Sequence, residues 1–270
     1  MSLPNKTQLL PDRPGIPPMA ALPEAETIDT AALASAYAAG DIDLICVLGP
    51  TASGKTRYAV RLAHALGNAE ILSADSRQVY CGMDIGTGKD LGEYGDVPYH
   101  LIDIVPAGTK YNIYEYQAAF AKAWADVLSR GCIPILCGGS GLYVEAATRA
   151  YKFDKENGVP ASELPQKVFY IGTLVTREER VARIDRRLDE RLEEGLVEEI
   201  RGLLDSGIPA ENLLWYGLEY KFVTQFILGE ISYEEMRILL ANAIHQFAKR
   251  QMTWFRGMER DGIRIHWVQV

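Results

Sequence analysis

Residues 44–56, LICVLGPTASGKT, carry the strongest structural signal in this chain. The stretch joins an apolar run to a loop of the form G-x-x-x-x-G-K-T, and a helix-forming segment follows. In loops of this kind, glycines let backbone N–H groups close around phosphate oxygens, and the helix N-terminus adds a favourable dipole. Lys55 supplies a positive charge, and the Thr56 hydroxyl can ligate Mg²⁺. The stretch therefore predicts a phosphate cradle between a buried strand and a helix.

The loop predicts where phosphate binds but not which molecule carries the phosphate. We expect phosphate contacts from Gly49, Thr51, Ala52, Ser53, Gly54, Lys55 and Thr56. A nucleoside triphosphate and another diphosphate fit the same cradle, because the loop binds phosphate oxygens. The loops after the other strands must therefore identify the reaction.

Short apolar runs alternate with helical stretches along the chain. The runs are LICVLG, EILSAD, YHLIDIV and IPILCGG, and VFYIGTLV follows later. Such runs joined by helices are typical of a parallel sheet covered on both faces. Right-handed crossovers bring the carboxyl ends of the strands to one edge, where ligands bind. We therefore predict an α/β fold, a P-loop NTPase-like parallel sheet flanked by helices, with a mostly helical C-terminal part.

The segments outside this alternation predict the domain organisation. Residues 1–25 contain many prolines and no hydrophobic periodicity, which predicts a poorly ordered leader before one catalytic domain over residues 26–270. The polar stretch 148–167, broken by Gly and Pro, predicts a surface connection or small excursion. Residues 177–204 predict one long, charged, amphipathic helix.

Composition limits the classes of function. The 270 residues, 48% of them hydrophobic, are enough for a large buried core. The formal net charge of -8 means that a polynucleotide partner would need a local basic surface. No apolar run approaches the roughly 18 residues of a spanning helix, and no secretory signal is present, so we expect no membrane association and a cytoplasmic location. The four cysteines lack metal-ligand spacing, which predicts buried, reduced thiols.

Polar side chains follow the strand EILSAD. Asp75, Ser76, Arg77 and Gln78 place a carboxylate, a hydroxyl, a guanidinium and an amide at the ligand edge. Asp75 fits two roles equally well: a helix cap or indirect Mg²⁺ ligand, and a general base facing the phosphate site.

Two further loops carry candidate groups. Lys89, in the glycine-rich turn GMDIGTGK, is either an ordinary solvated lysine or a second phosphate contact. His100 and Asp103 lie in an apolar run, which favours a role in the core. Ser140, in the turn GGSGLY, combines a hydroxyl with exposed N–H groups that suit an oxyanion or a bridging oxygen, although close packing also demands glycines there.

Taken in order, the segments GPTASGKT, SADSRQVY, MDIGTGK, YHLIDIV, GGSGLYV and AKRQMTWFR resemble the tRNA dimethylallyltransferase family. The resemblance covers residues 43–146 and 177–256. It implies transfer of a dimethylallyl group from dimethylallyl diphosphate to the exocyclic N6 amine of an adenine beside the anticodon of tRNA, assisted by Mg²⁺. The cradle would then hold a prenyl diphosphate in place of ATP.

The same resemblance implies roles for individual residues. Asp75 matches the proton acceptor, and Ser76, Arg77 and Gln78 match the stretch that contacts the target adenine. Lys55 and Thr56 match the diphosphate and metal contacts. Ser140 replaces the usual threonine at the bridging oxygen, and Arg183 and Arg187 match arginines that reach the diphosphate. The implied catalytic set is Asp75, Ser140 and Lys55.

One departure from the family leaves the acceptor open. Members carry a long helical insertion after the GGSGLY-like turn that embraces the anticodon stem, whereas only about 30 residues separate Tyr143 from the arginine-rich helix here. The chain could still modify tRNA, with the AKRQMTWFR segment and the basic edge of the arginine-rich helix as a reduced tRNA-binding surface. Alternatively, it could prenylate a free adenine nucleotide. An ATP-dependent small-molecule kinase and a non-catalytic degenerate relative are the alternatives from other classes.

Overall fold

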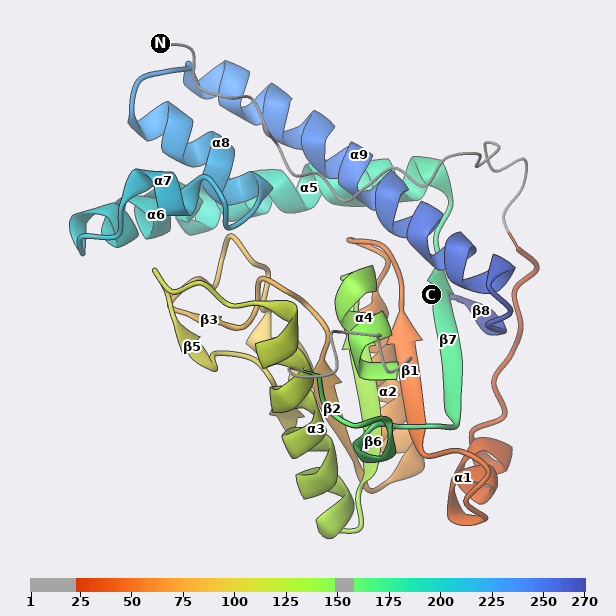
Figure 1. The fold of residues 1–270 in the computed structure, drawn as a ribbon. Helices are drawn as coiled ribbons and strands as arrows, with labels where there is room; N and C mark the ends of the chain where they lie inside the picture. The colour runs from red at the N-terminus through yellow and green to blue at the C-terminus, as the bar shows by residue number, and fades with distance from the viewer. Residues whose placement is uncertain (1–22, 149–157) are drawn as a thin grey trace.

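The computed structural model describes residues 23–148 and 158–270 (Figure 1). Most of the leader predicted at 1–25 and the middle of the excursion predicted at 148–167 lie outside these described residues. Within the described part of that connection, a single 3-10 turn, η2 (Ala161–Glu163), leads into the next strand.

A sheet of six parallel strands forms the centre of the structure, as predicted. Its spatial order is β4-β2-β6-β1-β7-β8. The strands are β1 (Leu44–Leu48), β2 (Ala69–Ser73), β4 (Tyr99–His100), β6 (Ile133–Gly138), β7 (Val168–Leu174) and β8 (Ile265–Gln269). The last strand was missed, because five residues after a long helix carry little periodicity. It lies at one edge, parallel to β7.

Helices cover both faces of this sheet (Figure 1). One face carries α1 (Thr30–Ala38) and α2 (Lys55–Leu66), and the other carries α3 (Ile113–Ser129) and α4 (Gly141–Thr148). Residues of β1 alternate between the two cores: Leu44, Cys46 and Leu48 pack toward α3 and α4, while Ile45 and Val47 pack toward α2. Both sets are fully buried, which explains why the strand is apolar throughout.

The run YHLIDIV does not form the single strand that its hydrophobicity predicts. Its first residues form β4, and Val105–Pro106 form β5, which pairs with β3 (Tyr80–Cys81) in a separate two-stranded sheet. Between them, Leu101 and Asp103 have φ angles of 66° and 55°. These left-handed residues turn the chain away from the main sheet.

The long helix predicted over 177–204 is two helices. Gly195, with φ 106°, ends α5 (Arg177–Glu194) and begins α6 (Leu196–Asp205). Glycine adopts this left-handed conformation without steric cost, so the chain changes direction there.

Helices α5 and α6, together with the helices that follow them, lie above the carboxyl edge of the sheet (Figure 1). After α6 come α7 (Ala210–Leu213), α8 (Leu218–Ile227) and α9 (Tyr233–Arg260). Earlier in the chain, residues Leu91–Tyr94 form a 3-10 turn, η1. Helices α5 and α9 are joined by the pair His245 and Asp185 at 2.8 Å and by Arg237 and Asp189 at 2.8 Å. These ion pairs join α5 to α9 within the layer of helices α5 to α9 above the sheet, which we call the helical roof.

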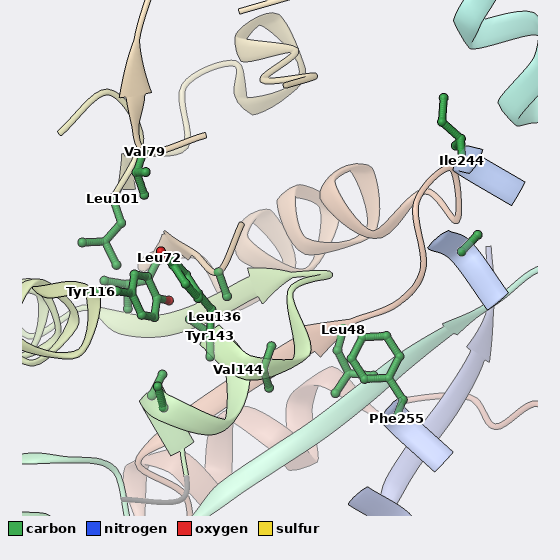
Figure 2. Close-up of a cluster of buried hydrophobic side chains, with 14 of the residues drawn as sticks. Leu48, Leu72, Val79, Leu101, Tyr116, Leu136, Tyr143, Val144, Ile244 and Phe255 are labelled. Atoms are coloured by element: carbon green, nitrogen blue, oxygen red, sulfur yellow. The ribbon is translucent and has the colours of Figure 1, made fainter. Parts of the chain in front are cut away.

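One hydrophobic cluster ties the roof to the sheet (Figure 2). Phe255 of α9 belongs to the same buried cluster as Leu48, at the end of β1. Tyr116 of α3 and Tyr143 of α4 stack with ring centroids 3.9 Å apart. The cysteine prediction is partly wrong: all four are free thiols, but Cys81 is exposed because β3 lies outside the main sheet.

Candidate active site

The glycine-rich loop between β1 and α2 adopts the conformation that its sequence predicts. Gly54 caps α2 in the left-handed region at φ 80°, and no side chain caps the helix. The first-turn N–H groups of α2 are therefore available to an anion. A Cβ atom on Gly49 would come within 2.1 Å of Thr173 Oγ1, so only glycine fits. Thr173, missed by the sequence analysis, donates to the buried Ser53 hydroxyl at 2.7 Å.

Lys55 lies at the start of α2 in an electrostatically mixed environment. Burial lowers the pKa of its amine, the Asp75 carboxylate opposes that shift, and Arg187 adds to it. Asp75, the predicted base, and Arg187, a predicted diphosphate contact, therefore both lie within electrostatic range of Lys55. Burial also raises the pKa of the neighbouring Cys137 thiol to about 12, with the Thr56 hydroxyl acting against the shift.

The loops that follow β2 and β6 meet at Ser140. Its hydroxyl oxygen accepts a hydrogen bond from the Ser76 backbone N–H at 3.0 Å, and the two hydroxyl oxygens lie 3.2 Å apart. The Asp75 carboxylate accepts the Arg77 N–H at 2.9 Å, so it caps a turn and not a helix. The structure thus brings Asp75 and Ser140 to one edge, on either side of Ser76.

Gln78 and Arg77 connect this edge to other elements. The Gln78 side chain is 9% exposed; its oxygen accepts from the Ser73 hydroxyl at 3.0 Å and its nitrogen donates to the Gly88 carbonyl at 3.1 Å. Arg77 donates to the Trp215 carbonyl at 3.1 Å. Their adenine contacts stay a prediction, and the structure shows which protein groups hold them in place.

Helix α5, which carries both predicted arginines, crosses above the carboxyl edge of the sheet (Figure 1). Arg183 lies over Gly54, where an added Cβ would be 3.9 Å from Nη1. Arg187, one turn further along, lies 3.5 Å from the Gly88 carbonyl oxygen. Their spacing of four residues puts both on one face of the helix, which is why both reach the cradle side.

Asp90 holds Arg187 in an ion pair. The same carboxylate lies 3.3 Å from Arg191, a buried arginine that also donates to the Ile85 carbonyl. Burial lowers the pKa of Arg191, and the nearby Arg187 adds to that shift. Two guanidinium groups therefore share one carboxylate at the loop 82–90, and Arg187 is near enough to Lys55 to act on its charge. This excess of positive charge is suited to a diphosphate.

The expectation that Lys89 is solvated is wrong, and its phosphate contact stays a prediction. The residue is 2% exposed, and its ammonium donates to the Tyr80 carbonyl at 2.7 Å, to Asp84 at 2.5 Å and to Asp103. These three acceptors use all the protons of an ammonium group. Lys89 therefore fastens the loop 82–90 to the turn after β4.

Glu199 of α6 fixes the same loop from the other side. Its carboxylate accepts hydrogen bonds from the backbone N–H groups of Asp84, Ile85 and Gly86 at 2.8, 2.7 and 3.1 Å, and from the Tyr220 hydroxyl at 2.7 Å. Burial raises the pKa of Tyr220, and the adjacent carboxylate adds to this effect. The sequence offered no signal for this contact, because Glu199 is one of many acidic residues on its helix.

The AKRQMTWFR segment, expected as a grip for tRNA, faces largely inward. Gln251 accepts the Thr51 N–H at 2.8 Å and donates to the Gly139 carbonyl at 2.9 Å. Trp254 covers Gly141, where an added Cβ would come within 2.3 Å of the indole. The segment therefore closes the catalytic edge, and Gln251 is a site residue that the motif contained but did not identify.

The donor set around the phosphate loop consists of hard oxygen ligands. Across residues 23–148 and 158–270, no group of three or more His, Cys, Asp or Glu side chains could hold a metal by itself. A cation at this site would therefore need oxygen ligands from its substrate as well as from the Thr56 hydroxyl.

Within the described residues 23–148 and 158–270, no helix is long and apolar enough to span a membrane.

Comparisons with known proteins agree with this geometry. The family model for IPP transferase matches residues 78–166 and 149–258. The chain is 46% identical to tRNA dimethylallyltransferase 2 of Porphyromonas gingivalis, over 83% of this chain and 93% of that protein. It is 44% identical to tRNA dimethylallyltransferase 2 of Bacteroides fragilis, over 84% and 93%.

A solved structure supports the fold. The full-length tRNA isopentenylpyrophosphate transferase of Bacillus halodurans superposes with a TM-score of 0.74 at 29% identity, over 84% of this chain and 89% of that one. The alignment with the Porphyromonas protein spans 282 positions, more than the 270 residues of this chain, so that relative contains a segment without a counterpart here. From the family match and these similarities, the chain belongs to the IPP transferase family.

Proposed function

We propose that this chain transfers a dimethylallyl group from dimethylallyl diphosphate to the N6 amine of an adenine in tRNA. The observation that best supports this reaction is that Lys55, Asp75 and Ser140 lie at one edge of the sheet, beneath the arginines of α5. Relatives named tRNA dimethylallyltransferase, at 43–46% identity over most of the chain, support the same reaction.

The reaction breaks an allylic C–O bond and forms a C–N bond. As the C–O bond breaks, its electron pair stays on the diphosphate, whose growing negative charge the amides of the loop and Lys55 can stabilise. Arg183 lies over Gly54 of this loop, and Arg187 lies beside Gly88, where its charge acts on Lys55. We propose that the Ser140 hydroxyl contacts the bridging oxygen, because it lies between the two loops that border the cradle.

Asp75 is the proposed acceptor of the proton that leaves the N6 amine. A neutral exocyclic amine is a weak nucleophile, so a carboxylate that orients the amine and takes its proton lowers the barrier to bond formation. The Asp75 carboxylate is held by the Arg77 N–H and interacts with Lys55, which places it between the cradle and the polar stretch Ser76 to Gln78.

The site also fits Mg²⁺. This ion usually takes one or two protein oxygens together with substrate phosphates, and Thr56 supplies a hydroxyl at the start of α2. When bound, Mg²⁺ would neutralise charge on the leaving diphosphate.

The test supplies isotope-labelled dimethylallyl diphosphate with either unmodified tRNA or AMP. We expect label in tRNA, and an Asp75→Asn variant with a large loss of kcat. The control, Asp41→Asn, changes an exposed carboxylate far from the edge and should behave as wild type. Label in AMP alone would show that the acceptor is a free nucleotide and not tRNA. No transfer to either acceptor would reject the proposed reaction.

A further inference from the structure

Trp215 lies exposed at the rim of the site. Its side chain is 68% exposed, more than any other large hydrophobic residue among the described ranges. Free tryptophan surface is unfavourable in water, and an indole face stacks well on a nucleobase. The exposed indole is therefore a candidate contact surface for a ligand.

The backbone of Trp215 is held rigidly although its side chain is exposed. Its N–H donates to the Asn212 carbonyl at 3.0 Å, and its carbonyl accepts from Arg77 at 3.1 Å. The next residue, Tyr216, is buried; its ring packs 4.5 Å from that of Tyr80, and its hydroxyl donates to the Thr109 carbonyl at 2.7 Å. The turn thus presents an indole from an anchored base, so little conformational freedom is lost when a partner stacks on it.

The position of Trp215 identifies the partner. Arg77 belongs to the stretch Asp75 to Gln78, the proposed acceptor side, and its guanidinium contacts the backbone of Trp215. Lys110, exposed, follows Thr109 on the segment that anchors Tyr216. An exposed indole whose backbone holds a guanidinium, with a lysine next to the segment that anchors Tyr216, offers a stacking face and positive charge to a nucleobase and its phosphates.

We infer that Trp215 is a stacking platform for the base of a nucleotide next to the target adenine in the tRNA acceptor. This inference rests on the proposed function. When the target adenine leaves its stack to reach Asp75, a neighbouring base loses a stacking partner, and the indole replaces it. Such a stacking contact would add affinity for the RNA in a chain that lacks a segment present in the Porphyromonas relative.

The test measures affinity for an anticodon stem-loop RNA, by fluorescence anisotropy, together with steady-state kinetics. Trp215→Ala should weaken RNA binding and raise KM for the RNA by about 5- to 100-fold, the range of one aromatic stack. The KM for dimethylallyl diphosphate should not change. Trp215→Phe should retain most of the affinity, because a phenyl ring still stacks. The matched control, Tyr233→Ala, removes another exposed aromatic, at the start of α9.

A second RNA separates stacking from other effects. Replacing the bases on either side of the target adenine, one at a time, by abasic nucleotides should weaken wild-type binding at one position and abolish the difference between wild type and Trp215→Ala there. Unchanged RNA affinity in Trp215→Ala, or an equal loss on every abasic RNA, would overturn the inference. Because RNA binding is measured without turnover, a wild type that binds RNA but does not prenylate it would reject only the proposed reaction.

Discussion

The Gln251 side chain accepts the backbone N–H of Thr51 at 2.8 Å, which links the middle of α9 to the phosphate loop across 200 residues of sequence. Its amide nitrogen donates to the Gly139 carbonyl at 2.9 Å. Gly139 in turn lies against Lys55, since an added Cβ would be 3.5 Å from Cε. One amide from the helical roof therefore sets the spacing of two catalytic loops.

Replacing Gln251 by leucine should loosen this spacing. We expect KM for the diphosphate to rise about tenfold and the free energy of unfolding to fall by about 1–3 kcal/mol, because the part-buried Thr51 N–H and the buried Gly139 carbonyl lose their partner. The control is Gln246→Leu, exposed on the same helix. Steady-state kinetics and urea unfolding measure both effects, and an unaltered KM for the diphosphate would show that Gln251 does not position the loop.

Replacing Lys89 by methionine should destabilise the protein. Removing a buried ammonium from two carboxylates typically costs about 3–5 kcal/mol; we expect about 2–4 kcal/mol, because Asp84 and Asp103 are partly exposed and regain water. Urea unfolding measures the change in stability, with Lys249→Met, at an exposed lysine, as the control. A variant of wild-type stability with a raised KM for the diphosphate would instead support the phosphate-contact role.

Replacing Glu199 by alanine should leave three backbone N–H groups and the Tyr220 hydroxyl without their acceptor. We expect a loss of about 2–4 kcal/mol in the free energy of unfolding. Formate, a small carboxylate that can occupy the vacated position, should restore part of the Tm. Glu198→Ala, at the exposed neighbouring residue, should neither lose stability nor respond to formate. A Glu199→Ala protein indifferent to formate would contradict the assigned contact.

The Glu70 carboxylate should make stability depend on acid pH. Its hydrogen bonds to Arg130, opposed by burial and aided by His100, lower its pKa from 4.5 to about 2. A depressed pKa means that this stabilisation is present above pH 4.5 and is lost as the pH falls toward 2. The Tm difference between wild type and Glu70→Gln should therefore shrink across that window. A constant difference would exclude the carboxylate as its source.

Asp75 should influence how diphosphate binding depends on pH. Burial lowers the pKa of Lys55, and Asp75 raises it. Asp75→Asn should therefore lower that pKa further, so binding of inorganic diphosphate should weaken at a lower pH than in wild type. Calorimetric titration across alkaline pH measures the two midpoints, and ionisation of the ligand cancels in the comparison. Identical midpoints, or a similar shift in Asp41→Asn, would contradict the coupling.

Predictions from sequence succeeded where a local pattern carries the physics. The phosphate loop, the parallel sheet and the convergence of Asp75 with Ser140 follow from strand ends that share one edge. Hydrophobicity alone failed at YHLIDIV, because left-handed residues such as Leu101 turn the chain away within an apolar run. It also failed at Gly195, where the glycine divides a continuous helical pattern.

The fold class, the phosphate loop and the family could be read from the chain alone, because glycine spacing and strand periodicity are local properties. The side chains that complete the site from other elements became known only from their packing in three dimensions. Gln251 reaches Thr51, Glu199 reaches the amides of loop 82–90, and Lys89 turns inward to two carboxylates. The first two contacts join elements more than 100 residues apart and exist only once helix packing brings donors and acceptors within hydrogen-bonding distance. The Lys89 contacts span far fewer residues, but they form only because the turn after β4 folds back onto the loop 82–90.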